Sequence, residues 1–329
     1  MRVAVTGAGG RLGRATLAAL ADAPFTGIAG PLAWGRPDYD LDDPGAAARL
    51  IARHRPEVIV HAAAWTDVDG CAREPEVALR RNGEAVGHLA RAAAGAGVDL
   101  VLISTNEVFD GQRDDGAGYG PDDVPNPINA YGASKLAGER AAAAAYGWPG
   151  GRAPEATGAV SGRGPEGREP ALAILRTAWL YGPPGNDFPE KIVRAAERAR
   201  ASGEALRVVA DETGSPTFTA DVAEAIVELI GGDPWAGGIQ HVVNAGAASR
   251  VGWARTVLER LGIDVAIEEV PGSTWQRAST PPAWAVLEPG PTTFLAEPLR
   301  PWPAALADYL PLLGRQLASR PAAPTDGPR

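Results

Sequence analysis

The stretch Val3-Ala4-Val5-Thr6-Gly7-Ala8-Gly9-Gly10-Arg11-Leu12-Gly13 decides the fold. The apolar run from Arg2 to Thr6 predicts a short buried strand, and the run from Arg14 to Ala23 is typical of a helix. The glycines between them allow a tight turn, a close approach of the backbone to a pyrophosphate and close packing of helix on strand. Free N–H groups at the start of the helix favour bound phosphate. This order of strand, glycine turn and helix indicates a dinucleotide-binding fold.

Strands and helices alternate through the first half of the chain. The third expected strand ends in the small residues Ala62, Ala63 and Ala64, which leave room for a cofactor at its carboxyl end. The alternation predicts an α/β fold with a Rossmann-type doubly wound parallel sheet and right-handed crossovers. After the first strand, the expected strands are 32–34, 57–64, 100–105 and 172–182, and the expected helices are 44–53, 75–94 and 131–145.

The loop after the second expected strand indicates whether the cofactor is NADPH or NADH. No acidic residue ends this strand where it would bind a ribose 2′-hydroxyl, and Arg36 follows instead. An arginine there accommodates a 2′-phosphate, so the sequence favours NADPH, with NADH as the alternative. A solvated loop arginine is the plainer interpretation of Arg36. Asp40 and Leu41 are expected to border the adenine.

Two polar patterns farther along the chain indicate proton chemistry. An apolar run ends in the hydroxyl pair Ser104-Thr105, and a helix begins near Tyr131. Tyr131 and Lys135 are four residues apart, so they share one face of that helix. An ammonium favours the phenolate and brings the pKa of a tyrosine toward the working range, while a strand-tip hydroxyl can hold a substrate carbonyl. Alone, this spacing indicates an ordinary amphipathic helix; the hydroxyl-tipped strand and the glycine turn favour catalysis.

The chain is expected to divide into a cofactor part and a substrate part. Residues 1–180 are expected to form the NAD(P)-binding Rossmann domain, and residues 181–329 a smaller C-terminal substrate lobe with some segments returning to the sheet. Residues 147–169 predict a flexible insertion and residues 320–329 a disordered tail. The substrate pocket is expected between the two parts. In this lobe the expected helices are 188–201, 221–230, 252–261 and 303–310, and the expected strands are 206–209, 238–244 and 265–267.

Composition limits the partners and the compartment. The 329 residues carry a net charge of −9, so neither nucleic acid nor an anionic membrane surface is an expected partner. No apolar run is long enough to cross a bilayer, and the early glycines argue against a signal peptide. The lone Cys71 excludes an internal disulfide and fits a reducing cytoplasm. The four histidines lack metal-ligand spacing, so no metal site is expected.

Six runs, spread over nearly the whole chain, match one family. They are Gly7–Gly13, Val60–Asp69, Ile103–Gly111, Asn126–Glu139, Leu175–Gly182 and Gly214–Thr217. With these runs the sequence resembles the extended short-chain dehydrogenase/reductase superfamily and, within it, the dTDP-4-dehydrorhamnose reductase family.

The resemblance implies a role for each matching position. Thr105 would hydrogen-bond the C4 carbonyl of a nucleotide-linked 4-keto-6-deoxy sugar, Tyr131 would donate the proton, and Lys135 would hold the nicotinamide ribose and lower the pKa of Tyr131. The nicotinamide would deliver hydride to C4, and Asn82 matches a helix asparagine of the family. Together with the loop after the second strand, the expected cofactor-binding residues are Gly7, Gly10, Arg11, Leu12, Gly13, Arg36, Asp40, Leu41, Ala62, Ala63, Ala64, Tyr131 and Lys135. The expected substrate-binding residues are Thr105, Asn106, Trp179, Ser215 and Pro216.

Three stretches depart from the family pattern. Asn106-Glu107 stands where the family usually has Asp-Tyr, and 281–285 replaces an Arg-Pro-x-x-Ser run. The 147–169 insertion has no match in the pattern. These departures bear on the sugar, the nucleotide and the partner surface rather than on hydride transfer.

Three functions follow from this reading. The leading one is NADPH-dependent reduction of dTDP-4-dehydrorhamnose to dTDP-rhamnose. The second is a related reductase acting on another activated sugar or a specialised metabolite. The third is a non-catalytic NADP-binding subunit like the regulatory β subunit of methionine adenosyltransferase, which resembles these reductases. A nucleotide sugar is the expected partner, a homodimer is allowed, and the expected location is cytoplasmic.

Overall fold

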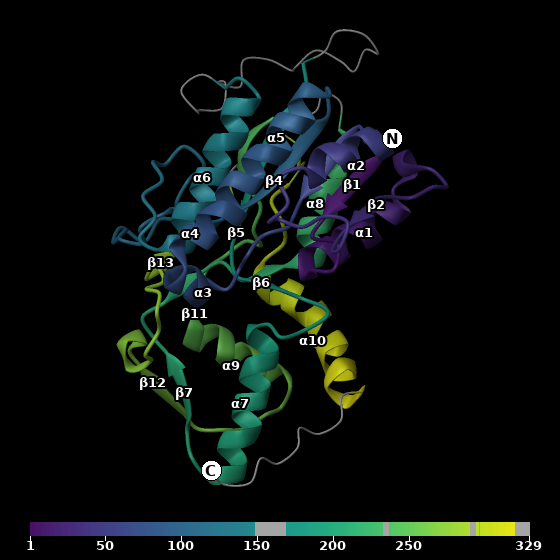
Figure 1. Ribbon diagram of the computed structural model, residues 1–329. Coiled ribbons are helices and arrows are strands. Elements are labelled where there is room, and N and C mark those ends of the chain that lie inside the picture. The colour runs from purple at the N-terminus through teal and green to yellow at the C-terminus, as the bar shows by residue number, and fades with distance from the viewer. Residues whose placement is uncertain (149–168, 233–236, 290–293, 296, 320–329) are drawn as a thin grey trace.

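A six-stranded parallel sheet forms the centre of the larger lobe in a computed structural model that describes residues 1–148, 169–232, 237–289, 294–295 and 297–319 (Figure 1). Its strand order is β10-β5-β4-β3-β1-β2, which confirms the doubly wound parallel sheet predicted from the sequence. Nearly all of the expected insertion and the whole expected tail lie outside the described residues. The strands are β1 (Val3–Thr6), β2 (Leu32–Trp34), β3 (Val58–His61), β4 (Asp99–Thr105), β5 (Leu172–Thr177) and β10 (Gly238–His241).

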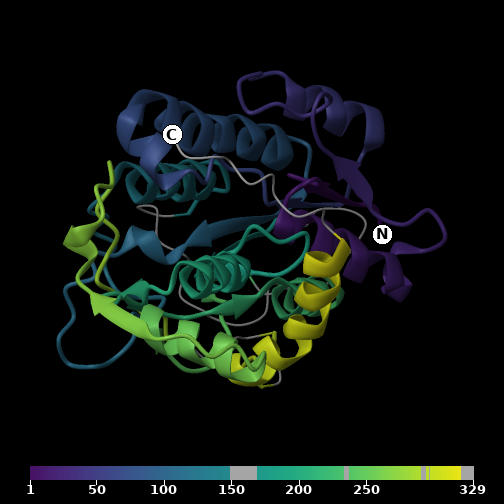
Figure 2. The same cartoon turned by 90° about the horizontal axis from the view of Figure 1, so that it is seen from below.

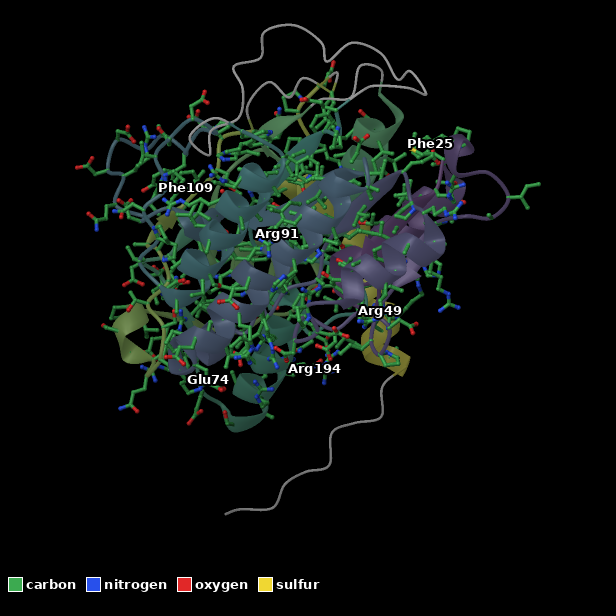
Figure 3. All side chains as sticks on the ribbon, turned by 45° about the horizontal axis from the view of Figure 1, so that its top comes forward. Phe25, Arg49, Glu74, Arg91, Phe109 and Arg194 are labelled. Atoms are coloured by element: carbon green, nitrogen blue, oxygen red, sulfur yellow. The ribbon has the colours of Figure 1, made fainter. Side chains whose placement is uncertain are left out.

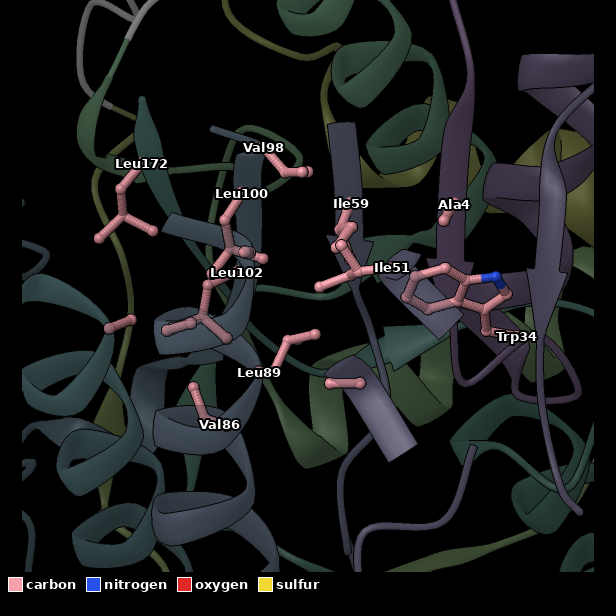
Figure 4. Close-up of a cluster of buried hydrophobic side chains, with 14 of the residues drawn as sticks. Ala4, Trp34, Ile51, Ile59, Val86, Leu89, Val98, Leu100, Leu102 and Leu172 are labelled. Carbon is pink, nitrogen blue, oxygen red and sulfur yellow. The ribbon is translucent and has the colours of Figure 1, made fainter. Parts of the chain in front are cut away.

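Helices cover both faces of this sheet, so its four inner strands, β1, β3, β4 and β5, are buried along their whole length. Along β4, Leu100 and Leu102 pack on one face, while Val101 and Ile103 pack on the other. Figure 4 shows the first of these clusters, which includes Trp34, the last residue of the edge strand β2. The helices α2 (Ala46–His54), α5 (Ala85–Gly95) and α6 (Ala130–Ala145) lie on this face, and α1 (Arg11–Asp22) and α8 (Thr219–Gly231) on the opposite face.

The strand order reverses beside β1. The strand β1 pairs with β2 on one side and with β3 on the other, so the crossovers from β1 and from β3 run in opposite directions. In open parallel sheets ligands bind in the crevice at the carboxyl ends of such strands. The carboxyl ends of β1 and β3 are Thr6 and His61, whose side chains are joined by a 2.8 Å hydrogen bond.

The smaller lobe lies beyond the carboxyl ends of the strands. In Figure 1 its helices α7, α9 and α10 lie below the sheet, and Figure 2 shows the molecule from that side. Stacked rings fill its core, with Trp253 against both Trp179 and Phe188. Its elements are α7 (Phe188–Ser202), β7 (Leu206–Val209), α9 (Arg250–Arg260), β12 (Ile267–Val270) and α10 (Trp302–Ser319), with β7 paired to β12.

Short strands connect the two lobes at the level of the crevice. The pair β6–β9 and the three-stranded group β11-β8-β13 lie there. Two later elements, α8 and β10, belong to the larger lobe even though they follow β6 in the chain. The bounds are β6 (Leu180–Tyr181), β8 (Thr213–Gly214), β9 (Thr217–Phe218), β11 (Ala248–Ser249) and β13 (Trp284–Ala285).

Several boundaries differ from those expected. The single strand expected over 172–182 is interrupted at Trp179, whose φ of 41° cannot continue a strand. The helix expected over 75–94 is α4 (Pro75–Ala78), a π-helical turn (Leu79–Glu84) and then α5. The last helix runs through Pro311 to Ser319, nine residues beyond the expected end. None of the helices in the described ranges is long and apolar enough to span a bilayer.

Candidate active site

The glycine turn between β1 and α1 packs against the end of β3. Gly7 has a φ of 66°, and a Cβ there would lie 2.8–2.9 Å from backbone atoms of Ala62 and Ala63. A Cβ on Gly13 would collide with the carbonyl oxygen of Gly7. Both positions therefore need glycine. The turn and the small residues that follow β3 together line the crevice at the switch point.

The N-terminus of α1 has no side-chain cap. Gly10 is the N-cap residue, and the first turn contains no acidic residue. The N–H groups of a first helical turn have no partner within the helix and carry partial positive charge. A Cβ on Gly9 would meet nothing within 4 Å, so the outer side of the turn is open. This turn therefore fits the pyrophosphate of a dinucleotide.

The side chains of Arg11 and Leu12 point away from the open side of the glycine turn. The Arg11 guanidinium donates to the carbonyl oxygens of Gly182 at 3.1 Å and Gly185 at 2.8 Å, and Leu12 is buried in the core. Both residues can thus offer a cofactor only their backbone N–H groups. The Arg11 side chain ties the turn to the chain that leaves β6.

The residues expected to choose the cofactor lie at the edge of the larger lobe. Arg36 is exposed directly after β2. Asp40 is half-buried and accepts the N–H of Asp42 at 3.0 Å, while Leu41 packs against the core cluster beneath α2. The structure therefore places Arg36, Asp40 and Leu41 together on this edge.

Thr105 and Tyr131 meet at the tip of β4. Thr105 is the last residue of the strand, and Tyr131 lies in the first turn of α6. Burial raises the pKa of Tyr131, and the hydrogen bond between its hydroxyl and that of Thr105 opposes only part of this rise. Thr105 Oγ1 also accepts the N–H of Glu107 at 3.2 Å. The structure thus brings together the two hydroxyls that the sequence placed on separate elements.

Lys135 lies one turn after Tyr131 and is buried. Its ammonium donates to the carbonyl oxygen of Ile103 at 2.8 Å. Burial lowers the pKa of Lys135 to about 8, and Glu139 partly opposes this shift.

The net pKa shift of Tyr131 runs opposite to the expectation. Burial and then the negative charge of Glu107 raise the pKa of the phenol, and together they outweigh the contact with Thr105. Lys135 is not among the groups that shift this pKa, and its Nζ is bonded to Ile103. The phenol is therefore protonated at neutral pH, which is the state that a proton donor needs.

Glu107 places a carboxyl group beside the catalytic helix. Its Oε2 accepts a 2.8 Å hydrogen bond from Nδ2 of Asn129, which is the N-cap residue of α6. Oδ1 of Asn129 accepts the N–H of Gly132, and Nδ2 also donates to the carbonyl of Thr280. Asn129 thus connects the start of the catalytic helix with Glu107 and with the segment before β13.

Asn82 holds the first turn of α6 from the other side. The π-helical turn carries Asn82, whose amide bonds both the N–H and the carbonyl of Trp65 at 2.8 and 3.0 Å. Its Nδ2 also donates to Ser134 Oγ at 3.1 Å, and Ser134 in turn donates to the carbonyl of Tyr131. Asn82 is therefore a positioning residue that acts through the backbone of Tyr131.

A buried ion pair supports the tip of β4 from below. Arg176 binds Glu139 through two hydrogen bonds of 2.8 and 3.0 Å, and both side chains are almost fully buried. Ser104 donates to the same carboxylate. The Arg176 guanidinium lies over the ring of Phe109, which is labelled in Figure 3. This cluster fixes β4 against α6 directly beneath Thr105.

Trp179 faces the crevice from the side of the smaller lobe. Its ring lies against Gly214, where a Cβ would come within 2.5 Å of it. On one face it stacks on Trp253, and the guanidinium carbon of Arg250 lies 3.6 Å from its ring centre. Arg250 and Arg277 both bind the carboxylate of Glu212, at 3.1 and 2.7 Å.

Two of the expected substrate-binding residues bond β13 and the chain just after it. Asn106 Nδ2 donates to the carbonyl of Ala285, and Ser215 Oγ accepts the N–H of Leu287. Both are buried, as is Pro216. These three residues shape the wall that carries β13.

Arg250 was not predicted from the sequence. It lies far from the other site residues in the chain, and only the packing of α9 on Trp179 brings it to the crevice. One local signal exists, because a cation in the first turn of a helix opposes the helix dipole. The ion pair with Glu212 explains why an arginine is tolerated at the start of α9.

A Rossmann-type sheet with a threonine, a tyrosine and a lysine at the tip of β4 defines the class of the extended short-chain dehydrogenases/reductases. Residues 1–147 and 166–314 match the model of the RmlD substrate binding domain family, and the chain belongs to that family. The resemblance drawn from the sequence motifs is thereby confirmed.

Individual relatives agree with this family. The dTDP-4-dehydrorhamnose reductase of Mycobacterium tuberculosis is 37% identical over 316 residues, which cover 94% of this chain and 92% of its own. The dTDP-4-keto-6-deoxy-D-glucose reductase of Streptomyces niveus is 35% identical over 317 residues, 94% of this chain and 96% of its own. The crystal structure of the dTDP-4-dehydrorhamnose reductase of Bacillus anthracis in complex with NADP is similar with a TM-score of 0.79, at 28% identity, over 94% of this chain and 99% of that one.

Proposed function

We propose that this chain uses NADPH to reduce the C4 keto group of a dTDP-linked 4-keto-6-deoxy sugar, with dTDP-4-dehydrorhamnose as the first substrate to test. The observation that carries the proposal is the hydrogen bond between Thr105 and Tyr131 at the tip of β4, with Lys135 one turn later. The names of the relatives support the same reaction.

The crevice has the features that a dinucleotide needs. The uncapped start of α1 would hold the pyrophosphate through the N–H groups of Arg11, Leu12 and Gly13, and Gly7 and Gly10 keep side chains out of its way. Ala62, Ala63 and Ala64 are half-buried and would leave room for the nicotinamide side of the cofactor. When bound, NADPH supplies the hydride. Arg36 would pair with the 2′-phosphate, and Asp40 and Leu41 would border the adenine.

The chain's own residues supply the proton and the orientation of the substrate. Thr105 and Tyr131 would hold the keto oxygen from two directions, because their hydroxyls already meet at one point. Tyr131 would give its proton to that oxygen as hydride arrives at the carbon, so that the product is an alcohol. Lys135 would leave the Ile103 carbonyl for the nicotinamide ribose. Trp179, Asn106, Ser215 and Pro216 would form the sugar-nucleotide side of the pocket.

The intact catalytic set favours an enzyme over a regulatory binding subunit. A subunit that only binds nucleotide has no need of a phenol bonded to a strand-tip threonine, nor of a lysine buried one turn away. The homodimer and the cytoplasmic location expected from the sequence stay predictions.

The test is oxidation of NADPH, followed by absorbance, with dTDP-4-dehydrorhamnose. We expect Tyr131→Phe to lower kcat by about 10²- to 10⁴-fold while NADPH still binds. Tyr146→Phe is the matched control, because that phenol lies at the far end of α6 and donates to the carbonyl of Val98. Turnover by Tyr131→Phe at the wild-type rate, or no turnover of any 4-keto sugar by the wild type, would overturn the proposal.

A further inference from the structure

Glu107 is a titratable group in the crevice to which the proposed reduction gives no task. It follows Thr105 by two residues, and its backbone N–H is bonded to Thr105 Oγ1. Its carboxyl group bonds Asn129, the N-cap residue of the helix whose first turn carries Tyr131, so it lies near the phenol that is to protonate the substrate. Its position is therefore beside the reacting carbonyl.

The carboxyl group has one anchored oxygen and one available oxygen. Oε2 accepts the hydrogen bond from Asn129, whereas no hydrogen bond to Oε1 is found within the described parts of the chain. The side chain is enclosed, and this desolvation raises the pKa of Glu107. Arg250 favours the ionised form and Glu212 opposes it. An enclosed acceptor of this kind gains most from a ligand that donates a hydrogen bond to it.

The chemistry of the sugar shows which donor that is. In a 4-keto-6-deoxy hexose, one neighbour of the carbonyl carbon is C3, which bears a hydroxyl. The other neighbour is C5, which bears a methyl group and offers no hydrogen-bond donor. Of the two neighbours of the carbonyl carbon, only C3 therefore offers a hydrogen-bond donor to a carboxyl group beside the carbonyl.

We propose that Glu107 accepts a hydrogen bond from the C3 hydroxyl of the sugar through Oε1 and makes that hydroxyl a requirement for efficient turnover. Glu107 is thus a specificity-determining residue, held in place by the N-cap of the catalytic helix. This inference rests on the proposed function, since it places the C4 carbonyl between Thr105 and Tyr131.

Glu107→Gln provides a sharp test because the two side chains have the same shape. Asn129 donates to residue 107, so the glutamine oxygen would face Asn129 and its NH₂ group would face the sugar. The variant therefore replaces an acceptor by a donor. Asp110→Asn is the matched control, since this carboxylate lies in the same turn and binds Tyr119 and Asn126 instead.

The measurement is kcat/KM for a dTDP-4-keto-6-deoxy sugar and for its 3-deoxy counterpart. We expect the wild type and Asp110→Asn to prefer the hydroxylated sugar by about 10- to 100-fold. Glu107→Gln should lose that preference, with a fall in kcat/KM for the hydroxylated sugar only. Equal losses on both sugars, or a wild type that does not discriminate between them, would refute the role.

The experiment distinguishes a failure of the proposed reduction from a failure of the role proposed for Glu107. If the wild type turned over neither sugar, the activity would be refuted, and calorimetric Kd values for dTDP-6-deoxyhexoses with and without the C3 hydroxyl would still decide the role of Glu107. A preference lost in Glu107→Gln would support it, and no preference in the wild type would overturn it.

Discussion

The amide nitrogen of Asn129 lies 2.8 Å from a carboxylate oxygen of Glu107, so the residue that caps the catalytic helix also anchors an acid in the crevice. The same amide bonds the carbonyl of Thr280 on the wall that carries β13. The start of α6, the turn after β4 and this wall are thereby fixed relative to one another. We therefore expect substitutions of Asn129 to affect both the stability of the fold and the activity.

Asn129→Ala should therefore impair both properties. Loss of the cap should lower the free energy of unfolding by about 1–2 kcal/mol, measured by urea denaturation. Asn129→Ser should restore most of that stability, because serine also caps helices, but its side chain is too short to reach Glu107. Full activity in the serine variant would show that the anchoring of Glu107 has no catalytic value.

Gly13→Ala should disrupt the turn between β1 and α1. Its Cβ would collide with the carbonyl of Gly7, so either α1 moves or the turn opens. We expect weaker NADPH binding by fluorescence titration and a loss of about 2 kcal/mol or more in stability. Gly9→Ala is the control for stability, because its Cβ would meet nothing within 4 Å. Equal melting temperatures for the two variants would contradict this account of the turn.

Lys135 should make the free energy of unfolding depend on pH between about 8 and 10.5. Burial lowers its pKa from 10.5 to about 8, so between these values the unfolded chain binds a proton that the native state has released, and stability rises with pH. Below pH 8 both states are protonated, and the buried ammonium costs about 3 kcal/mol.

Lys135→Met should accordingly be inactive yet more stable at pH 7. We expect a gain of about 2 kcal/mol, because about 1 kcal/mol is lost with the hydrogen bond to Ile103. The gain should shrink as the pH rises toward 10.5. The exposed Lys191→Met is the control, with no change at either pH. A destabilised Lys135→Met at pH 7 would refute the assigned cost.

Arg176→Met should be among the most destabilising changes in the larger lobe. It leaves the carboxylate of Glu139 buried without its bidentate partner, which typically costs about 3–5 kcal/mol. The double variant Arg176→Met/Glu139→Leu should recover most of that loss, since no uncompensated charge remains. Chemical denaturation of the wild type, Arg176→Met, Glu139→Leu and the double variant checks the cycle, and additive losses would contradict it.

The sheet and the three proposed catalytic residues could be predicted from patterns that are local in the sequence. The strand, turn and helix over residues 3–22 are contiguous, and Tyr131 and Lys135 are related by one helical turn. The spacing of the pair gained its catalytic interpretation only from the hydroxyl-tipped strand and the glycine turn. The pairing of Thr105 with Tyr131 needed only the expectation that strand tips and the next helix share one edge of the sheet.

Features that depend on distant packing were not predicted. The break at Trp179 follows from its position between Gly214 and Arg250, which are remote in the chain. The last helix continues through Pro311 because its apolar face packs on the smaller lobe, and this outweighs the missing N–H of proline. The pKa of Tyr131 was expected to fall because the burial of the phenol and the proximity of Glu107 cannot be seen in spacing.

The guanidinium of Arg11 has a mechanical consequence. It grips the carbonyls of Gly182 and Gly185 at the root of the smaller lobe, while its own N–H belongs to the phosphate-facing turn. The glycine turn and the base of the smaller lobe are thus joined through one side chain, so a displacement of either one would strain or break these hydrogen bonds.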